Sequence, residues 1–167
     1  MIADWQLMGR RLSCFQIYNY QIMSYNNTHE DSDKNVEQNG IIYLINLEKN
    51  TAGVIGSNLV NDEIIIPRSI RYESTEYIVT SIVERAFYRS DIKLIKFPTD
   101  SEIQIFEKES FSYSQIEKIK IPPHLKIIGE SSFFRCIRFY KIEIPSNSEL
   151  QTIEDNAFNG SSIENFT

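Results

Sequence analysis

The chain has 167 residues, of which 41% are hydrophobic and 12% aromatic, enough for one domain with a sizeable core. Its formal net charge of −6 argues against a general attraction to nucleic acid or anionic lipid, so we expect no nucleic-acid partner. The only cysteines are Cys14 and Cys136, too few for a disulfide framework and without the C-x-x-C spacing of a zinc or redox site.

Residues 1–39 are predicted to form an irregular or disordered N-terminal extension and linker. The first 25 residues contain arginines but no apolar stretch after them, so they predict no signal peptide. Residues 26–39 read NNTHEDSDKNVEQN, an acid-rich polar stretch typical of a solvated linker. The longest apolar runs of the chain, such as IIYLI at 41–45, are far shorter than the about 20 residues of a membrane-spanning helix. We therefore expect no membrane insertion.

Residues 40–78 are predicted to form a β-rich N-terminal cap built from hairpins. From Gly40 the sequence GIIYLINLEKNTAGVIG places two apolar stretches around a polar LEKN turn. From Ile70 the sequence IRYESTEYIVTSI places a Ser-Thr turn between aromatic and β-branched arms. The intervening EIIIP at 63–67 predicts a short strand.

Residues 79–167 repeat one apolar pattern about four times, and the last copy is incomplete. The apolar positions of residues 79–98 and 103–122 agree throughout with a shift of 24. The third unit, 125–145, has one extra residue in its middle, and the fourth stops before its proline. Such self-similarity is typical of a solenoid, because one unit cannot bury its apolar face alone whereas stacked units form a continuous core.

Each unit contains an x-I-x-I-P motif whose period of two predicts a short strand with one buried face, ended by proline. We expect these strands to be parallel and to lie near 64–66, 94–97, 118–121 and 141–144. The stretch I-x-E-x-(A/S)-F predicts short helical or 3₁₀ turns on the opposite side of each coil, each with a glutamate near its start. One phenylalanine per unit is expected in a buried structural ladder: Phe87, Phe111, Phe133 and Phe158.

The pattern I-x-x-x-A-F-x-x-(S/C), followed by I-x-x-I-x-I-P, resembles the BspA-like leucine-rich repeat. YIVTSIVERAF and LKIIGESSFFRC carry the resemblance, and residues from Gly40 resemble the β-rich lead-in of that family. Over residues 40–167 the resemblance implies an α/β-type repeat solenoid with short parallel strands and little regular helix. It also implies a surface antigen that acts in cell adhesion by binding a host protein. The alternative is an intracellular interaction scaffold or a fragment of a longer repeat protein.

The sequence predicts no enzyme, cofactor or metal site. His29 and His124 have no acid or nucleophile at a catalytic spacing, and no nucleotide-binding or hydrolase motif occurs. One glutamate per unit is expected along one edge, a pattern more typical of solvated, helix-capping residues than of a metal site: Glu84, Glu107, Glu130 and Glu154.

The residues that alternate with the buried isoleucines must point outward from each predicted strand. We expect the binding site on this sheet face, at Leu94, Lys96, Lys118, Lys120, Lys141 and Glu143. Stacking at about 4.8 Å per strand would gather the lysines into one basic patch. Either the lysines merely keep an exposed sheet soluble, or they dock an acidic protein or a sulfated or sialylated glycan.

The end of the sequence adds one further expectation. The chain stops at Thr167, where a fourth repeat strand should be completed, so apolar side chains and a strand edge would face water there. Solenoids need a polar terminal cap. We predict either self-association through the C-terminal end or a native chain that continues further.

Overall fold

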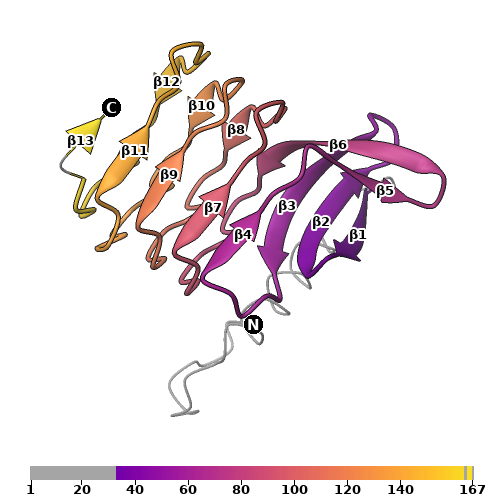
Figure 1. The fold of residues 1–167 in the computed structure, drawn as a ribbon, viewed down its shortest axis with the longest axis horizontal. Helices are drawn as coiled ribbons and strands as arrows, with labels where there is room; N and C mark the ends of the chain where they lie inside the picture. The colour runs from indigo at the N-terminus through magenta and orange to yellow at the C-terminus, as the bar shows by residue number, and fades with distance from the viewer. Residues whose placement is uncertain (1–32, 164, 167) are drawn as a thin grey trace, which may run out of the picture.

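The computed structural model describes residues 33–163 and 165–166 (Figure 1), so the predictions for residues 1–32 lie outside the described part of the chain. The described residues form two sheets and contain no helix. One sheet has eight strands in the order β1-β2-β3-β6-β8-β10-β12, with β5 also paired to β6. The other has five strands in the order β13-β11-β9-β7-β4. The result is a β-solenoid with an antiparallel N-terminal cap.

The cap contains both hairpins that the sequence predicts. Strands β2 (Ile41–Asn46) and β3 (Thr51–Ser57) pair antiparallel across the LEKN turn. Strands β5 (Ser69–Tyr72) and β6 (Thr75–Ile82) form the second antiparallel pair, which extends away from the coils (Figure 1). The far half of β6 pairs in parallel with β3, and this contact joins the cap to the coils.

Residues 33–38 differ from the prediction of a linker over 26–39. They form strand β1 (Asp33–Gln38), which pairs antiparallel with β2 through a turn at Asn39 and Gly40, both with positive φ. Such turns match the twist of the paired strands. Because β1 lies at the edge of the sheet, its side chains stay partly or fully exposed. Its residues can therefore be polar, and such a composition does not indicate a strand in the sequence.

One strand per coil forms the five-stranded sheet, and all neighbouring pairs are parallel, as predicted. The predicted and observed positions agree to within one residue at each end for the first four strands. The strands are β4 (Glu63–Ile65), β7 (Leu94–Lys96), β9 (Lys118–Lys120), β11 (Lys141–Glu143) and β13 (Asn165–Phe166). Strand β4 lies within the segment 40–78, so the stacking of coils begins before Val79.

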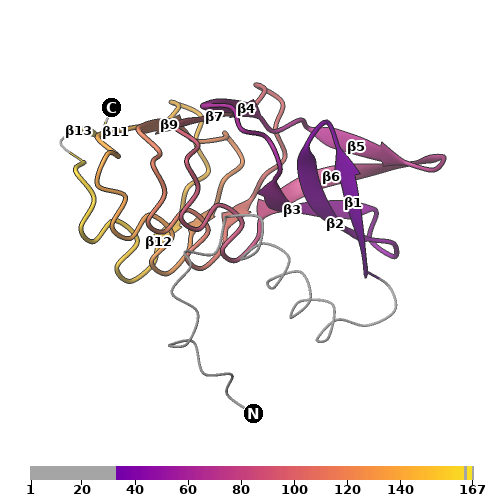
Figure 2. The same cartoon turned by 90° about the horizontal axis from the view of Figure 1, so that it is seen from below.

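Each coil also contributes a short strand to the eight-stranded sheet, a feature that the sequence did not predict. These strands are β8 (Ile105–Phe106), β10 (Ile127–Ile128) and β12 (Thr152–Ile153), which continue from β6 in parallel. Two residues are too short for an alternating pattern to appear in a sequence. Figure 2 shows the cap strands gathered at one end and the coils stacked away from them.

Hydrogen-bonded turns, not the predicted helical turns, follow each of these short strands. Residues two before and two after each ladder phenylalanine adopt positive φ, as in Arg85 and Arg89 around Phe87. A positive φ at the third position of a turn is the hallmark of type II. The positive φ values on both sides of each phenylalanine are incompatible with a right-handed helix, so no helix forms there.

The turns of successive coils are joined by backbone hydrogen bonds. The N–H of Phe87 donates to the carbonyl of Ser110 at 2.7 Å, and the N–H of Phe111 donates to the carbonyl of Ser132 at 2.8 Å. Residues two positions before and after Phe87, Phe111 and Phe133 make matching bonds to the next coil. The stacked turns therefore form a regular backbone array, which we call the turn edge.

The ladder phenylalanines stack through the core between the turn edge and the sheets. Phe87, Phe111 and Phe133 are at most 2% exposed, and Phe158 is partly buried in the last coil. Ring centroids lie 5.5 Å apart for Phe87 and Phe111, 4.8 Å for Phe111 and Phe133, and 5.4 Å for Phe133 and Phe158. The rings of all three pairs are stacked and nearly parallel, so the coils share one continuous aromatic core.

Candidate interaction surfaces

The outer surface of the five-stranded sheet, which we call the sheet face, carries the predicted binding residues in two rows. Strand pairing places Glu63, Leu94, Lys118 and Lys141 side by side in one row. In the second row Ile65 lies beside Lys96, and Lys120 lies beside Glu143. Neighbouring residues in a row are about 4.8 Å apart along the hydrogen-bonding direction.

Two of the four lysines on the sheet face are engaged in ion pairs. Lys96 Nζ lies 2.6 Å from Glu63 Oε1, and Lys141 Nζ lies 2.8 Å from Glu143 Oε1. The hydrogen bond and charge of Lys141 lower the pKa of Glu143, with smaller contributions from Lys120 and Lys118. These pairs are exposed and contribute little to stability. The uniformly basic patch expected from the sequence is therefore partly neutralised.

The centre of the sheet face stays basic. Lys118 and Lys120 are exposed on β9, and among the described residues neither lies within ion-pair distance of an acid. Ile65, on the edge strand β4, is 61% exposed. The sheet face thus presents two cations between two neutral ion pairs, with one apolar side chain at its end.

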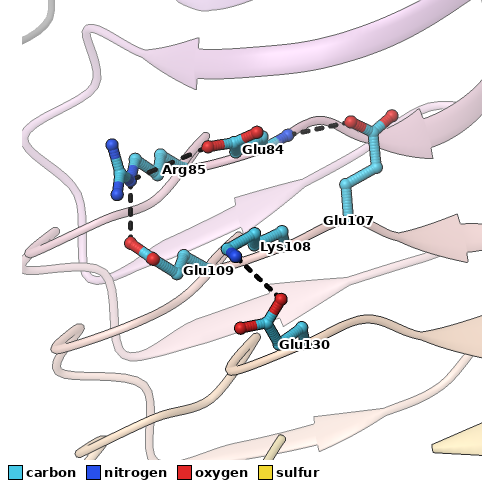
Figure 3. Close-up of polar contacts among 6 residues, drawn as sticks. All are labelled: Glu84, Arg85, Glu107, Lys108, Glu109 and Glu130. Atoms are coloured by element: carbon cyan, nitrogen blue, oxygen red, sulfur yellow. Dashed lines mark hydrogen bonds and ion pairs between the residues drawn. The ribbon is translucent and has the colours of Figure 1, made fainter. Parts of the chain in front are cut away.

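The turn edge holds the recurring glutamates in a network with the backbone (Figure 3). The N–H of Glu84 donates to the Glu107 carboxylate of the next coil at 3.1 Å. In the same way the N–H of Glu130 donates to Glu154 at 2.9 Å. These carboxylates cap the amides of turns, not the helices that the sequence suggested. Side-chain pairs also join neighbouring coils: Arg85 Nε to Glu109 Oε2 at 2.7 Å and Lys108 Nζ to Glu130 Oε2 at 2.7 Å.

Beside this network lies a group of aromatic and arginine side chains that the sequence analysis missed. We call it the turn-edge strip; its members are Tyr88, Arg89, Tyr113, Phe134 and Arg135. The rings of Tyr88, Tyr113 and Phe134 are half-buried and pack edge to face, with centroids 5.7 and 5.6 Å apart.

Both arginines of the turn-edge strip lie against its rings. Arg89 Cζ lies 5.3 Å from the ring centre of Tyr88 and 5.5 Å from that of Tyr113, and Arg135 Cζ lies 5.5 Å from that of Phe134. All three distances are typical of cation–π contacts.

Groups with potential for chemistry are sparse in the described part of the chain. No cluster of His, Cys, Asp and Glu there has the geometry of a metal site. His124 Nδ1 lies 2.9 Å from Glu149 Oε1 on the surface, while His29 lies outside the described residues. Cys136 is fully buried; burial raises the pKa of its thiol, which contacts the Phe111 carbonyl at 3.0 Å and Ser114 Oγ at 3.5 Å. A thiol held this way is a poor nucleophile.

The repeated coils match one known family. The model of the BspA type leucine-rich repeat region matches residues 61–167, in six copies. The chain belongs to the BspA-type leucine-rich repeat family. The match begins just before β4, in agreement with the coil stacking that begins there. Leucine-rich repeats of this kind are generally non-catalytic interaction folds.

Solved structures share the fold of this BspA-type protein. A leucine-rich repeat protein from Bacteroides capillosus is 24% identical, with a TM-score of 0.69; the match covers 79% of this chain and 96% of that one. The pneumococcal vaccine antigen PcpA is 20% identical, with a TM-score of 0.60. That match covers 80% of this chain but only 46% of PcpA. The chain matches no curated protein.

Proposed function

We propose that this protein is a non-catalytic adhesion module that binds a host protein or an acidic glycan through its sheet face. The observation that carries the proposal is the pair Lys118 and Lys120, exposed side by side along β9 with no acid in ion-pair distance among the described residues. An unneutralised pair of cations on a rigid sheet attracts anionic groups. Exposed charges are screened over about 8 Å at physiological ionic strength, so binding depends strongly on salt.

A surface location fits this role. Membership of the BspA-type family supports it, as does the description of PcpA as a vaccine antigen. No helix among the described residues is long and apolar enough to cross a membrane. Labelling intact cells with a membrane-impermeant reagent before lysis distinguishes this location from the alternative of an intracellular scaffold.

The binding test compares two double variants that remove the same charge. Lys118→Ser with Lys120→Ser removes the central cations, whereas Lys49→Ser with Lys126→Ser removes two lysines away from the sheet face. Binding to heparin and to extracellular matrix is measured at low and at high salt. We expect the first variant to lose most low-salt binding and the second to retain it. Equal binding by both folded variants would contradict the proposal. The lysines would then serve only to keep the sheet soluble.

A further inference from the structure

We propose that the third unit carries a second docking surface, separate from the sheet face, for a partner protein segment in which apolar side chains stand beside carboxylates. We call this surface the insertion site; its members are Ile137, Arg138 and Tyr140. None of the three belongs to a strand of the sheet face, so the proposal does not depend on binding there.

The extra residue of the third unit has to leave the core. In the second unit, Gln115 alone joins two buried residues. In the third unit two residues, Ile137 and Arg138, lie between the same two core positions. Those positions are occupied by Cys136 and Phe139, both fully buried. Because both ends are held in a close-packed core, the longer connection projects outward.

The longer connection closes as a β-turn. The N–H of Phe139 donates to the Cys136 carbonyl at 2.9 Å, so Ile137 and Arg138 are the central residues of the turn. In the second unit the N–H of Gln115 donates to a carbonyl of the preceding coil at 2.9 Å. Neither central N–H of the turn donates to another described residue. The extra residue thus leaves two backbone donors available to a carboxylate.

The side chains of the insertion site combine apolar surface with one cation. Ile137 is 66% exposed and Tyr140 is 45% exposed. Arg138 is exposed too, and it makes no ion pair or ring contact with another described residue. By contrast, Arg135 lies against a ring and Lys141 pairs with an acid. Tyrosine and arginine are enriched at the centres of protein interfaces, so this composition fits a protein partner.

Charge selects an acidic partner segment. Residues 134–141 contain three cations and no acid. The acid in register with Tyr140 is Glu117, whose carbonyl accepts the Tyr140 N–H at 2.9 Å, but no ion pair joins Glu117 to Arg138 in the described chain. A partner carboxylate can therefore meet the guanidinium and the turn amides in charge-assisted hydrogen bonds. Because the exposed isoleucine needs an apolar contact, a protein segment fits better than a sulfated glycan.

One short segment can cover the whole site. The Cα atoms of Ile137 and Tyr140 are three residues apart and so lie at most about 11 Å from each other. Side chains on one face of an extended segment repeat about every 6.7 Å. Six extended residues, with an apolar pair between acids, therefore reach both apolar side chains and the cation.

The test uses a labelled peptide, Glu-Asp-Leu-Phe-Asp-Glu, and two control peptides. Gln and Asn replace the acids in one control, and Ser replaces Leu and Phe in the other. Fluorescence anisotropy measures affinity, and the backbone amide resonances of Ile137 and Arg138 report where the peptide binds. The variant is Ile137→Ser with Arg138→Gln. Its matched control, Ile65→Ser with Arg71→Gln, removes an isoleucine of 61% exposure and an exposed arginine elsewhere.

We expect the acidic apolar peptide to bind and to shift both amide resonances, and both control peptides to bind at least about tenfold more weakly. The insertion-site variant should weaken binding about tenfold, because it removes an apolar contact and a charged hydrogen bond. The matched control should change binding by less than about twofold. Equal losses in the two variants, equal binding of the Ser peptide, or no peptide binding would overturn the proposal. A preference for a heparin hexasaccharide that the insertion-site variant loses would also overturn it.

Deletion of Arg138 adds an independent test, because it restores the connection to the length found in the second unit. We expect this variant to lose peptide binding, and binding equal to that of the parent would contradict the proposal. The substitutions, at exposed positions, decide the question if the deletion unfolds the coil. Lys118→Gln with Lys120→Gln should weaken heparin binding but not peptide binding, so failure of the sheet face is distinguished from failure of the insertion site.

Discussion

The sheet face and the turn edge belong to the same coils, yet they hold their charges by different means. On the sheet face, ion pairs such as Lys96 with Glu63 join two flexible side chains above flat strands. On the turn edge, Glu107 and Glu154 bind backbone amides of the preceding coil, and Arg89 lies against two rings. The turn edge is thus ordered before any partner arrives, whereas lysines of the sheet face lose rotamer freedom on binding. A repeat can therefore present one adaptable and one preorganised surface.

The aromatic core between the two surfaces should control the stability of both. Phe111 is fully buried and stacks on Phe87 and Phe133. We expect Phe111→Ala to lower the free energy of unfolding by about 3–5 kcal/mol, as truncation of a core aromatic does. Phe158→Ala, at the partly buried end of the ladder, should cost clearly less. Urea denaturation of both variants measures the difference, and equal costs would mean that the ladder does not act as one core.

The buried thiol offers a measure of how firmly the turn edge is closed. Cys136 lies in the turn after Phe133, where burial raises its pKa and the Phe111 carbonyl accepts its S–H. In a Cys14→Ser background we expect Cys136 to react with a thiol reagent at least about 100-fold more slowly than after denaturation, because labelling requires local opening. Addition of Phe111→Ala should accelerate labelling. Fast labelling of the parent protein would contradict a preorganised turn edge.

Close backbone packing should make the turn edge less tolerant of substitution than the sheet face. A Cβ at Gly129 would lie 2.7 Å from the Phe106 carbonyl oxygen and 2.9 Å from the Glu107 carbonyl carbon. Because both atoms belong to the backbone of the preceding coil, we expect Gly129→Ala to cost about 1–3 kcal/mol. Lys120→Ala on the sheet face should change stability by less than about 0.5 kcal/mol. Thermal melts of the two variants test this prediction. Similar melting temperatures for Gly129→Ala and Lys120→Ala would contradict it.

The repeat register made most of the fold predictable. Buried residues recur with a shift of 24, so the strands around Ile95 and Ile119 and the stack of Phe87 on Phe111 follow from spacing alone. Strand β1 was missed because an edge strand needs few apolar residues, and β8 was missed because two residues show no period. The positive φ of residues such as Arg85 is imposed by coil stacking, since arginine has no preference for it.

The surfaces were less predictable because recognition residues depart from the repeat. Tyr88 follows its ladder phenylalanine by one residue and Tyr113 by two, so no sequence column contains both, although their rings meet in the structure. The partner of Lys96 is Glu63, which precedes the first phenylalanine-marked unit. Spacing reports what each coil shares with its neighbours; contacts between unlike positions appear only when the coils are stacked.

The smallest expected effect concerns the ion pair at the side of the sheet face. Lys141 lowers the pKa of Glu143 below its ordinary 4.5, so the ionised carboxylate favours the folded state. That contribution is complete above the unfolded pKa and is lost as pH falls through the folded value. Glu143→Gln should therefore be slightly less stable than the parent at neutral pH, and the difference should vanish at a pH low enough to protonate Glu143 in the folded state. Urea midpoints at both pH values measure it, with Lys141→Gln and the double variant completing a cycle. A difference that persists in acid would show that Glu143 acts through packing, and the sheet face would then be more preorganised than its exposed ion pairs indicate.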